Sequence, residues 1–323
     1  MRKYRLAIAV GGAALLPVAI ALLAQQPAPA TPTPQRPIIV RVERVPVLFT
    51  ALDRKERFVT DLSRDEIHVF DNKKKQEILE FTKETDLPLR IGLLIDASNS
   101  VRERFKFEQE AAIEFLNSVL RPKTDRAMVL SFDTNAEVVQ DFTDDLGKLS
   151  EAIHSLRPGG GTAMYDAIYH AVRDKLMAEE PGGGVRRTII LISDGDDNQS
   201  RGSREDTLAM AQRGEVTIFA ISTNRGNPEQ AEKSGTKPAG GEQPGDRVLR
   251  RFAEETGGRV FFPFKAADLN TSFERIGQEL RSQYALLYRP NTPRDGSFHS
   301  IEVVSQRKGI KIRARKGYFA VRE

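Results

Sequence analysis

The chain has 323 residues, and its 39% hydrophobic and 29% charged residues are typical of a folded globular protein rather than a disordered one. This length suggests about two domains of ~100–200 residues each. The absence of cysteine excludes disulfides, zinc–thiolate sites, iron–sulfur clusters and cysteine nucleophiles. The formal net charge is +4, and its meaning for a nucleic-acid partner depends on where the excess lies.

The N-terminal segment has the features of an export signal. Arg2, Lys3 and Arg5 precede an apolar run over residues 6–24, and small residues follow it. We therefore expect residues 1–24 to be a signal peptide or, because the run approaches the ~20 residues that span a bilayer, an uncleaved membrane anchor. In both cases the body of the chain lies outside the cytoplasm, so the protein is periplasmic, secreted or membrane-anchored, and this anchor is the one membrane contact we expect.

A Pro-rich stretch, residues 25–37, predicts an extended linker. Residues 38–86 then show short strand patterns, with Asp71-Asn72-Lys73 as a hairpin turn between EIHVF and EILEF. Such short strands need partners to protect their edges. The partners are expected in residues 284–323, where YALLY, FHSIEVVSQ and GIKIRARKGYFAV are again strand-like. Together the two chain ends predict a small β-sandwich.

Between these ends, residues 87–283 alternate strands with helices. The apolar runs around LRIGLLI, AMVLSF, TIILIS, VTIFAIS and RVFFPF predict strands, and amphipathic segments between them predict helices. This alternation predicts an α/β fold, a doubly wound and mostly parallel Rossmann-like sheet inserted in the sandwich. Residues 224–246 are polar and rich in Gly and Pro, which indicates a long surface loop that we interpret as a tolerated insertion.

Three polar loops follow predicted strands or glycines in this middle region. Asp96, Ser98 and Ser100 come directly after the first strand, Thr162 follows three glycines, and Asp194 follows another buried strand. Ligands bind outside the carboxyl ends of strands in open α/β sheets, so these side chains are expected to meet there. Each also has a structural interpretation: Ser100 and Thr162 as helix N-caps, and Asp194 as part of an Asp-Gly turn.

The chemistry of this set favours a hard cation. Two carboxylates, three hydroxyls and water provide only oxygen ligands, which suit Mg²⁺ best, with Mn²⁺ or Ca²⁺ as alternatives. Because so few anions surround it, the metal stays electrophilic. It can then accept a carboxylate from another protein as its last ligand.

The motifs DASNS, GGGT and SDG, in this order and on these elements, resemble the metal-ion-dependent adhesion site (MIDAS) of von Willebrand factor type A (VWA) domains. The resemblance covers roughly residues 87–283, and the flanks resemble a bacterial subgroup of exported VWA-related proteins. It implies an exported adhesion module that grips a protein ligand through a metal-bridged carboxylate. It also implies the residues that hold the divalent ion, some of them through water: Asp96, Ser98, Ser100, Thr162 and Asp194.

Two other functions are weighed against this one. A Mg²⁺-dependent phosphoryl-transfer enzyme with an aspartyl nucleophile at Asp96 would need a second carboxylate two residues on, where Ser98 stands. The four histidines form no HExxH pair, and neither G-x-S-x-G nor a phosphate-binding G-x-x-x-x-G-K-[ST] loop occurs. We therefore expect no enzyme. The other alternative is an interaction scaffold that needs no metal.

The remaining charges have ordinary interpretations. Residues 307–316 hold six basic residues, but their alternation is that of a strand with one solvated face. Residues 1–30 contain three basic residues and no acidic one, so without them the net charge falls from +4 to +1. We expect no nucleic-acid partner. Asp196 and Asp197 are interpreted as part of a solvated turn rather than a calcium loop, and Asp133 and Asp166 as structural residues or supports of the site.

Overall fold

The computed structural model describes most of the chain after its N-terminal segment. The described residues all belong to one compact unit, Val42–Glu323, and comprise 44–83, 87–179, 184–224, 243–263, 266–291 and 295–320. The predicted signal and linker lie outside them, as does most of the polar loop. Within these segments, no helix combines the length and apolarity that crossing a bilayer requires.

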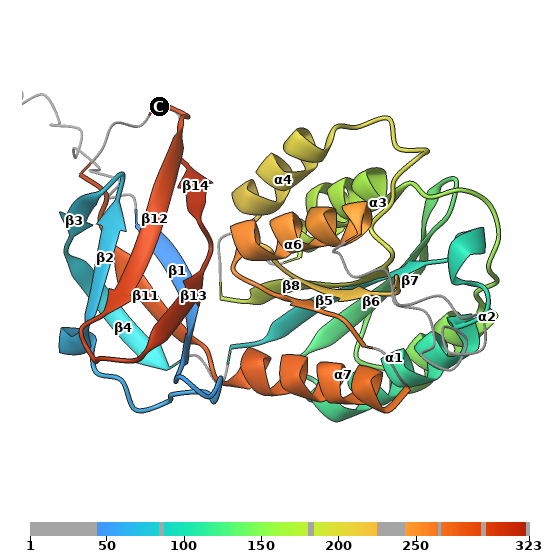
Figure 1. The fold of residues 1–323 in the computed structure, drawn as a ribbon, viewed down its shortest axis with the longest axis horizontal. Helices are drawn as coiled ribbons and strands as arrows, with labels where there is room; N and C mark the ends of the chain where they lie inside the picture. The colour runs from blue at the N-terminus through green and yellow to red at the C-terminus, as the bar shows by residue number, and fades with distance from the viewer. Residues whose placement is uncertain are drawn as a thin grey trace, which may run out of the picture. The chain divides into compact units, whose positions relative to one another are not determined.

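A six-stranded sheet forms the centre of the middle region (Figure 1). Its strand order is β10-β9-β8-β5-β6-β7, and all neighbours are parallel except β6 and β7. The residues of β5, β8 and β9 are almost entirely buried, as their apolar runs predict. The strands are β5 (Leu89–Asp96), β6 (Arg126–Phe132), β7 (Ala136–Thr143), β8 (Arg186–Ser193), β9 (Thr217–Ser222) and β10 (Val260–Phe261).

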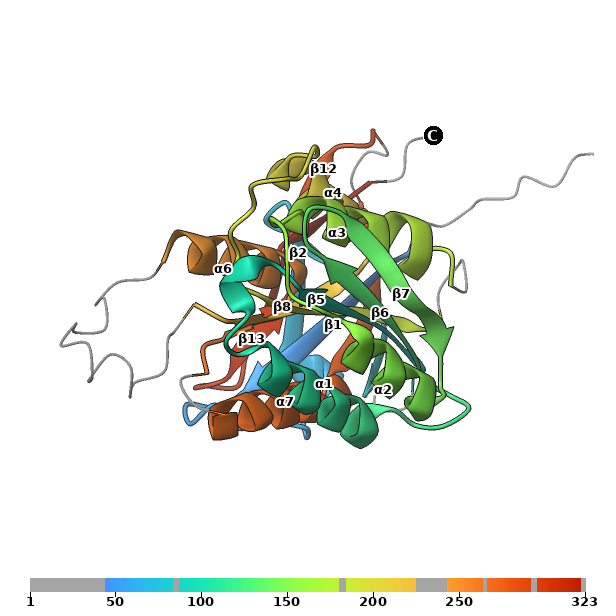
Figure 2. The ribbon, with the colours of Figure 1, turned by 90° about the vertical axis from the view of Figure 1, so that its right-hand side faces the viewer.

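Helices cover both faces of this sheet, which confirms the predicted doubly wound fold (Figures 1 and 2). One apolar core joins the sheet to α1, α2 and α7, and a second joins its other face to α3, α4 and α6. A π-helical turn, Ala171–Leu176, continues α3. The helices are α1 (Phe105–Val119), α2 (Leu146–Ser155), α3 (Met164–His170), α4 (Arg204–Arg213), α6 (Pro244–Thr256) and α7 (Ala266–Arg281).

The two chain ends form a β-sandwich, as predicted. One sheet has the order β13-β1-β11-β4 and the other β14-β12-β2-β3, so each sheet contains two strands from each chain end. A third apolar core lies between them. The strands are β1 (Val45–Leu52), β2 (Ile67–Asp71), β3 (Lys74–Gln76), β4 (Ile78–Lys83), β11 (Tyr284–Tyr288), β12 (Phe298–Ser305), β13 (Lys311–Ala314) and β14 (Gly317–Phe319).

The structure differs from the sequence patterns in the pairing of short strands. The expected turn forms, with Asn72 and Lys73 at positive φ, but β2 pairs with β3 rather than with the EILEF segment. That segment is β4, which crosses to the other sheet and pairs with β11. The antiparallel edge strand β7 was not predicted, because its half-exposed residues lack the continuous apolar run of the buried strands.

Candidate metal centre

Two of the polar loops begin at neighbouring strand ends. β5 and β8 are adjacent and parallel, and they end at Asp96 and Ser193. Parallel strands end at the same sheet edge, so Asp96 and Asp194 leave the sheet side by side. Asp96 is fully buried and Asp194 is 8% exposed.

A continuous series of hydrogen bonds links four of the five predicted residues. The Ser98 main-chain N–H donates to Asp96 Oδ1 at 2.9 Å, and the Ser98 and Ser100 hydroxyl oxygens are 2.8 Å apart. Ser100 Oγ donates to Asp194 Oδ2 at 2.7 Å, so Ser98 is the donor to Ser100. This series of hydrogen bonds thus runs from the end of β5 to the end of β8. Ser100 lies in a short 3₁₀ turn, and α1 begins only at Phe105, so Ser100 is not its N-cap.

Main-chain hydrogen bonds hold Thr162 near this series of hydrogen-bonded residues. Its N–H donates to Asn198 Oδ1 at 3.0 Å, and its carbonyl oxygen accepts from the N–H groups of Asn198 and Gln199. The loop before it is tied to the first loop, because Gly159 N–H donates to the Ala97 carbonyl at 2.6 Å. Thr162 is 4% exposed and does not cap α3, whose N-cap is the next residue. Within the described part of the chain, its hydroxyl makes no hydrogen bond to the other four side chains.

Ser193 is a site residue that the sequence patterns did not single out. Its hydroxyl donates to Asp96 Oδ2 at 2.7 Å and accepts from the N–H of Gly195 at 3.0 Å. Both oxygens of Asp96 therefore receive a hydrogen bond. Burial raises the pKa of Asp96 to about 6, against the lowering effect of hydrogen bonds from Ser193 and Ser98, and the nearby Asp194 adds to the rise. Ser193 stands next to Asp194 in the SDG motif, and this position could have indicated from the sequence that Ser193 belongs to the site.

A glycine contact fixes the Asp194 loop against α6. Gly195 has φ +81°, and a Cβ there would lie 2.3 Å from the carbonyl oxygen of Gly245. A Cβ on Gly245 would in turn lie 2.1 Å from the Asp194 carbonyl oxygen. Only glycines allow this approach of two backbones. The SDG motif therefore needs its glycine for packing as well as for the turn.

The ends of the polar loop 224–246 also support Asp194. Asn224 Nδ2 donates to the Asp194 carbonyl at 2.5 Å and to Asp246 Oδ1 at 2.9 Å. Ser222, the last residue of β9, donates to the same Asp246 oxygen at 2.6 Å. The interpretation of 224–246 as an insertion missed this role of its two ends, since Asp246 is buried within the first turn of α6. Residues 225–242 lie outside the described part of the chain.

Glu108 is a second residue that sequence reasoning missed. It is 2% exposed, and neither of its carboxylate oxygens has a hydrogen-bond partner in the described structure. Burial raises the pKa of Glu108 to about 8, Arg104 opposes the rise, and the charges of Asp96 and Asp194 add to it. Its place on the apolar stripe of α1, three residues after Phe105, could have indicated from the sequence that this carboxylate is buried.

The other acidic residues have structural roles. Asp197 accepts hydrogen bonds from the Tyr165 main chain and from Ser200, and Asp166 accepts from the main chain at 201 and 202. Asp133 accepts from Asn135 N–H and, through its carbonyl, from Ala163 N–H. These bonds hold the loops in place. The pKa of Asp196 is raised by burial and by the charges of Asp194 and Asp246.

The donor set is chemically suited to a divalent cation. In the described residues no cluster of three or more His, Cys, Asp or Glu side chains is arranged for a metal. The predicted site has only two carboxylates, however, and its other donors are hydroxyls. The buried Asp96 lies in a low-dielectric environment, and a cation would favour its charged form. The hydroxyls of Ser98 and Ser100 retain lone pairs that can face a cation.

Comparison with known proteins gives a family for part of this chain. The family model described as the von Willebrand factor type A domain matches residues 91–196, which contain most of β5, the whole of β8 and all five predicted residues. The chain matches none of the curated proteins. VWA domains are generally protein-interaction modules and commonly bind a divalent metal at the MIDAS.

Several solved structures match part of this chain. Proximal thread matrix protein 1 from the mussel byssus, with a zinc-occupied MIDAS motif, is 18% identical at a TM-score of 0.49 and covers 65% of this chain and 50% of its own. The von Willebrand factor type A protein from Catenulispora acidiphila is 14% identical at a TM-score of 0.47 and covers 87% and 75%.

An aerotolerance-related membrane protein from Bacteroides fragilis is 20% identical at a TM-score of 0.45 and covers 60% and 98%. The chain spans about half the length of the mussel proteins that it matches. Residues 91–196 match the von Willebrand factor type A domain, and the doubly wound sheet to which they contribute agrees with that match.

Proposed function

We propose that this chain is an exported, metal-dependent protein-binding module that uses a MIDAS. The metal is Mg²⁺, or Mn²⁺ or Ca²⁺ in its place, and its protein ligands are Asp96, Ser98, Ser100, Thr162 and Asp194. The observation that carries the proposal is the continuous contact from Asp96 through Ser98 and Ser100 to Asp194. It supports a cation site because both carboxylates and both hydroxyls already converge on one point of the sheet edge.

The proposed partner is a protein that offers a carboxylate. Mg²⁺ prefers six oxygen ligands and keeps several waters, so a site with two carboxylates leaves a position that an incoming carboxylate can take from water. The family match supports a binding role rather than catalysis. We propose export because the N-terminal residues combine a basic start with an apolar run. The family match is compatible with export but does not require it.

A calorimetric titration tests the metal site directly. The purified chain, freed of metal by EDTA and dialysis, is expected to take up one Mg²⁺ or Mn²⁺, and Asp194→Ala is expected to lose that uptake because one of two carboxylates is gone. Asp196→Asn is the matched control, since it lies two residues further on in the same loop and is not among the proposed ligands. Equal uptake by Asp194→Ala and the unaltered chain would contradict the assignment.

Ligand binding and catalysis are separated by two further measurements. Capture of exported or surface proteins on the immobilised chain is expected with Mg²⁺ and lost with EDTA or in Asp194→Ala. A Mg²⁺-dependent phosphatase turnover that disappears in Asp96→Asn would instead establish an enzyme. Binding that is unaffected by EDTA would favour the metal-independent scaffold.

A further inference from the structure

A cavity lies at the edge of the central sheet opposite the proposed metal site. The metal site follows the carboxyl ends of β5 and β8, whereas the cavity is lined by residues where β8 and β9 begin, among them Arg186 and Thr217. Its volume is about 430 Å³, within the range of about 300–1,000 Å³ typical of small-molecule pockets. Figure 1 shows the β-sandwich beside this edge of the sheet, and strands of the sandwich supply the other wall of the cavity.

The sandwich wall of the cavity is the outer face of the sheet that contains β1 and β11. Successive side chains of a strand point to opposite faces, and Val47 and Phe49 of β1 face the sandwich core. The intervening residues face outward, and the Thr50 hydroxyl among them donates to Glu279 of α7 at 3.0 Å. This outer face is therefore turned toward the α/β region. It lines the cavity with four apolar residues, which form two cross-strand pairs: Pro46 with Leu287, and Leu48 with Ala285.

The wall from the α/β region combines apolar and polar side chains. Val185, Ala211 and Val216 are buried and line it with further apolar surface. Gln212 and Thr217 also line it and are only 6% and 8% exposed. Neither the Gln212 amide nor the Thr217 hydroxyl makes a hydrogen bond within the described part of the chain. Because buried polar groups are normally hydrogen-bonded, these two are suited to a polar group of a ligand.

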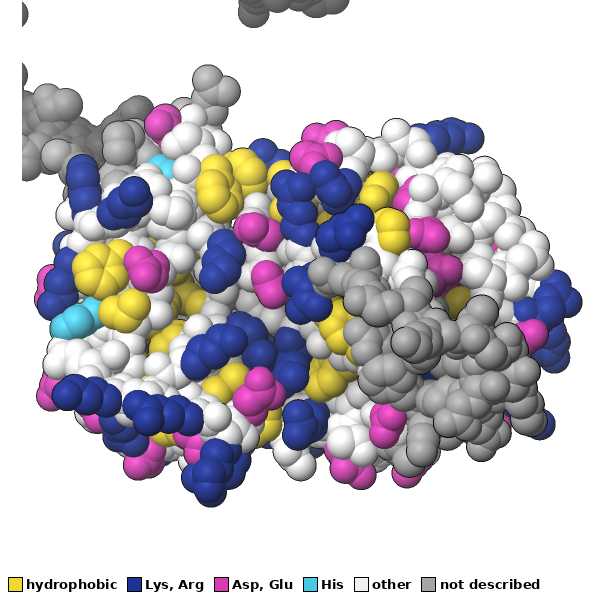
Figure 3. Space-filling model, viewed as in Figure 1, with side chains coloured by type: hydrophobic (Ala, Val, Ile, Leu, Met, Phe, Trp, Pro, Cys, Tyr) yellow, Lys and Arg dark blue, Asp and Glu magenta, His cyan; other side chains and the backbone are white. Residues whose placement is uncertain are grey.

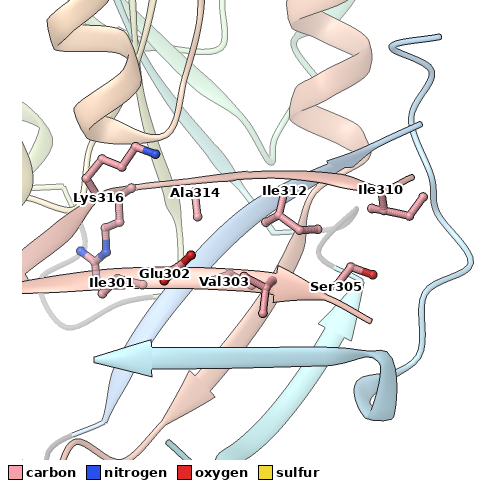
Figure 4. Close-up of a pocket in the computed structure, with 10 residues that line it drawn as sticks. Ile301, Glu302, Val303, Ser305, Ile310, Ile312, Ala314 and Lys316 are labelled. Carbon is pink, nitrogen blue, oxygen red and sulfur yellow. The ribbon is translucent and has the colours of Figure 1, made fainter. Parts of the chain in front are cut away.

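A buried arginine joins the two walls. Arg315 comes directly after β13, which Figure 4 shows lying along β12 with Ile312 and Ala314 directed toward that strand. Arg315 reaches the cavity instead, where its Nη2 donates to the Pro46 carbonyl at 2.7 Å and to Glu215 Oε1 at 3.1 Å. It is 8% exposed, and its Nε and Nη1 have no hydrogen-bond partner in the described structure. The guanidinium thus holds one carboxylate and leaves two nitrogens unused.

The charge of the lining selects the kind of ligand. Four arginines and one glutamate, Glu215, line the cavity, and one of the arginines, Arg44, pairs with Glu80 outside it. Figure 3 shows further Lys and Arg side chains on the part of the surface where β13 and α6 lie in Figure 1. This basic surrounding attracts anions and repels cations. The four arginines of the lining are Arg44, Arg186, Arg187 and Arg315.

Glu215 indicates where the anionic group of a ligand would bind. Its carboxylate already rests on Arg315, although its side chain is 43% exposed. An exposed carboxylate gains little from such an ion pair, because water solvates it almost as well. A ligand carboxylate carried by an apolar body gains more, because the cavity also removes that body from water. A guanidinium binds planar carboxylates through two parallel hydrogen bonds, so the ligand can take the place of Glu215 on Arg315.

We propose that this cavity binds a small organic acid that carries one carboxylate on an apolar body. The carboxylate replaces that of Glu215 on Arg315 and accepts hydrogen bonds from the Gln212 amide and the Thr217 hydroxyl. The apolar body packs against the outward-facing side chains of β1 and β11. This binding needs no metal and takes place at the opposite edge of the sheet, so it is independent of the function proposed above.

Calorimetry with octanoate tests the proposal on the full chain in EDTA. Octanamide, which has the same body without the charge, and acetate, which has the charge without the body, are the controls. Octanoate is expected to bind saturably with a Kd below ~1 mM and at least ~10-fold more tightly than either control. Equal binding of a control, or no binding of octanoate up to ~10 mM, would overturn the proposal. Octyl phosphate is the fourth probe, and its tighter binding than octanoate would show a phosphate site, contrary to the proposal.

NMR spectroscopy locates the bound acid without any substitution. Saturating octanoate is expected to shift the side-chain amide signals of Gln212 and the main-chain amide signals of Val216 and Thr217. The main-chain amide signals of Ser98 and Ser100, at the proposed metal site, are expected to stay unchanged. Binding that leaves the Gln212 signals in place occurs elsewhere on the chain and refutes the assignment of this cavity.

Two substitutions in the ion pair are expected to act in opposite directions. Arg315→Gln removes the cation and is expected to weaken octanoate binding at least ~10-fold. Glu215→Gln removes the competing carboxylate from an exposed position, where the fold tolerates the change, and is expected to tighten binding ~3-fold or more. Glu205→Gln, an exposed position in the first turn of α4, is the matched control and is expected to bind as the unaltered chain does. Unchanged or weaker binding by Glu215→Gln would show that the acid does not replace this carboxylate and would overturn the proposal.

Discussion

Glu108 shows how one residue couples the proposed site to the stability of the domain. Its carboxylate lies on the buried face of α1 without a hydrogen-bond partner in the described structure. The charges of Asp96 and Asp194 contribute to the rise of its pKa. Its pKa of about 8 in the folded chain exceeds the ordinary value of 4.5. The folded state therefore holds a proton that the unfolded state has already lost between these two pH values.

This difference predicts a pH-dependent stability. Any contribution from Glu108 is fully present below about pH 4.5 and is lost as the pH rises toward 8, at up to about 1.4 kcal/mol per pH unit. In Glu108→Gln, which carries no titratable group, the free energy of unfolding is expected to fall less between pH 5 and 8. Urea unfolding in EDTA at several pH values measures it. Parallel pH profiles for both proteins would refute the prediction.

At the scale of elements, the site depends on how closely the loop after β8 approaches the start of α6. The left-handed backbone of Gly195 and the 2.3 Å that would separate a Cβ from the Gly245 carbonyl oxygen leave no room for a side chain. The loop and the helix thus hold Asp194 in position together. Neither element alone sets the direction of its carboxylate.

Gly195→Ala is expected to lower the free energy of unfolding by about 2 kcal/mol or more, because alanine is strained at positive φ and the two backbones must separate. Metal uptake is expected to weaken with it. Gly159→Ala is the matched control in a neighbouring loop, since a Cβ there meets nothing within 4 Å. Urea unfolding and calorimetry check both variants, and equal stability of the two would contradict this reading of the loop.

At the scale of the whole molecule, a buried polar cluster joins the two chain ends in the sandwich. Asp71 of β2 accepts hydrogen bonds from the hydroxyls of Tyr288 and Tyr318 at 3.0 and 2.9 Å, and its other oxygen lies 3.2 Å from His299 Nδ1. Asp71 is fully buried, and its three partners come from β11, β14 and β12. One N-terminal carboxylate therefore links three C-terminal strands.

Removal of this carboxylate is expected to destabilise the sandwich. Asp71→Ala leaves two buried tyrosine hydroxyls without their acceptor, which costs about 3 kcal/mol or more. Asp65→Ala, at an exposed position just before the same strand, is expected to change stability by less than about 0.5 kcal/mol. Urea unfolding followed by tyrosine fluorescence measures both. A loss below about 1 kcal/mol for Asp71→Ala would show that the cluster does not hold the ends together.

Local patterns determined much of this protein from the sequence alone. The buried runs of β5, β8 and β9 and the amphipathic helices predicted the doubly wound sheet, because strand and helix periodicity depend on residues close together in the chain. The same locality placed Asp96 and Asp194 at strand ends. The strand patterns at the two chain ends are also local, and together they predicted the sandwich.

Only the tertiary structure decided which distant residues meet. The crossing of β4 to the other sheet, the bond from Ser193 to Asp96 and the support of Asp194 by Asn224 and Asp246 join segments far apart in sequence. No local period encodes these contacts, because sheet order, register and burial are set by the packing of the whole chain.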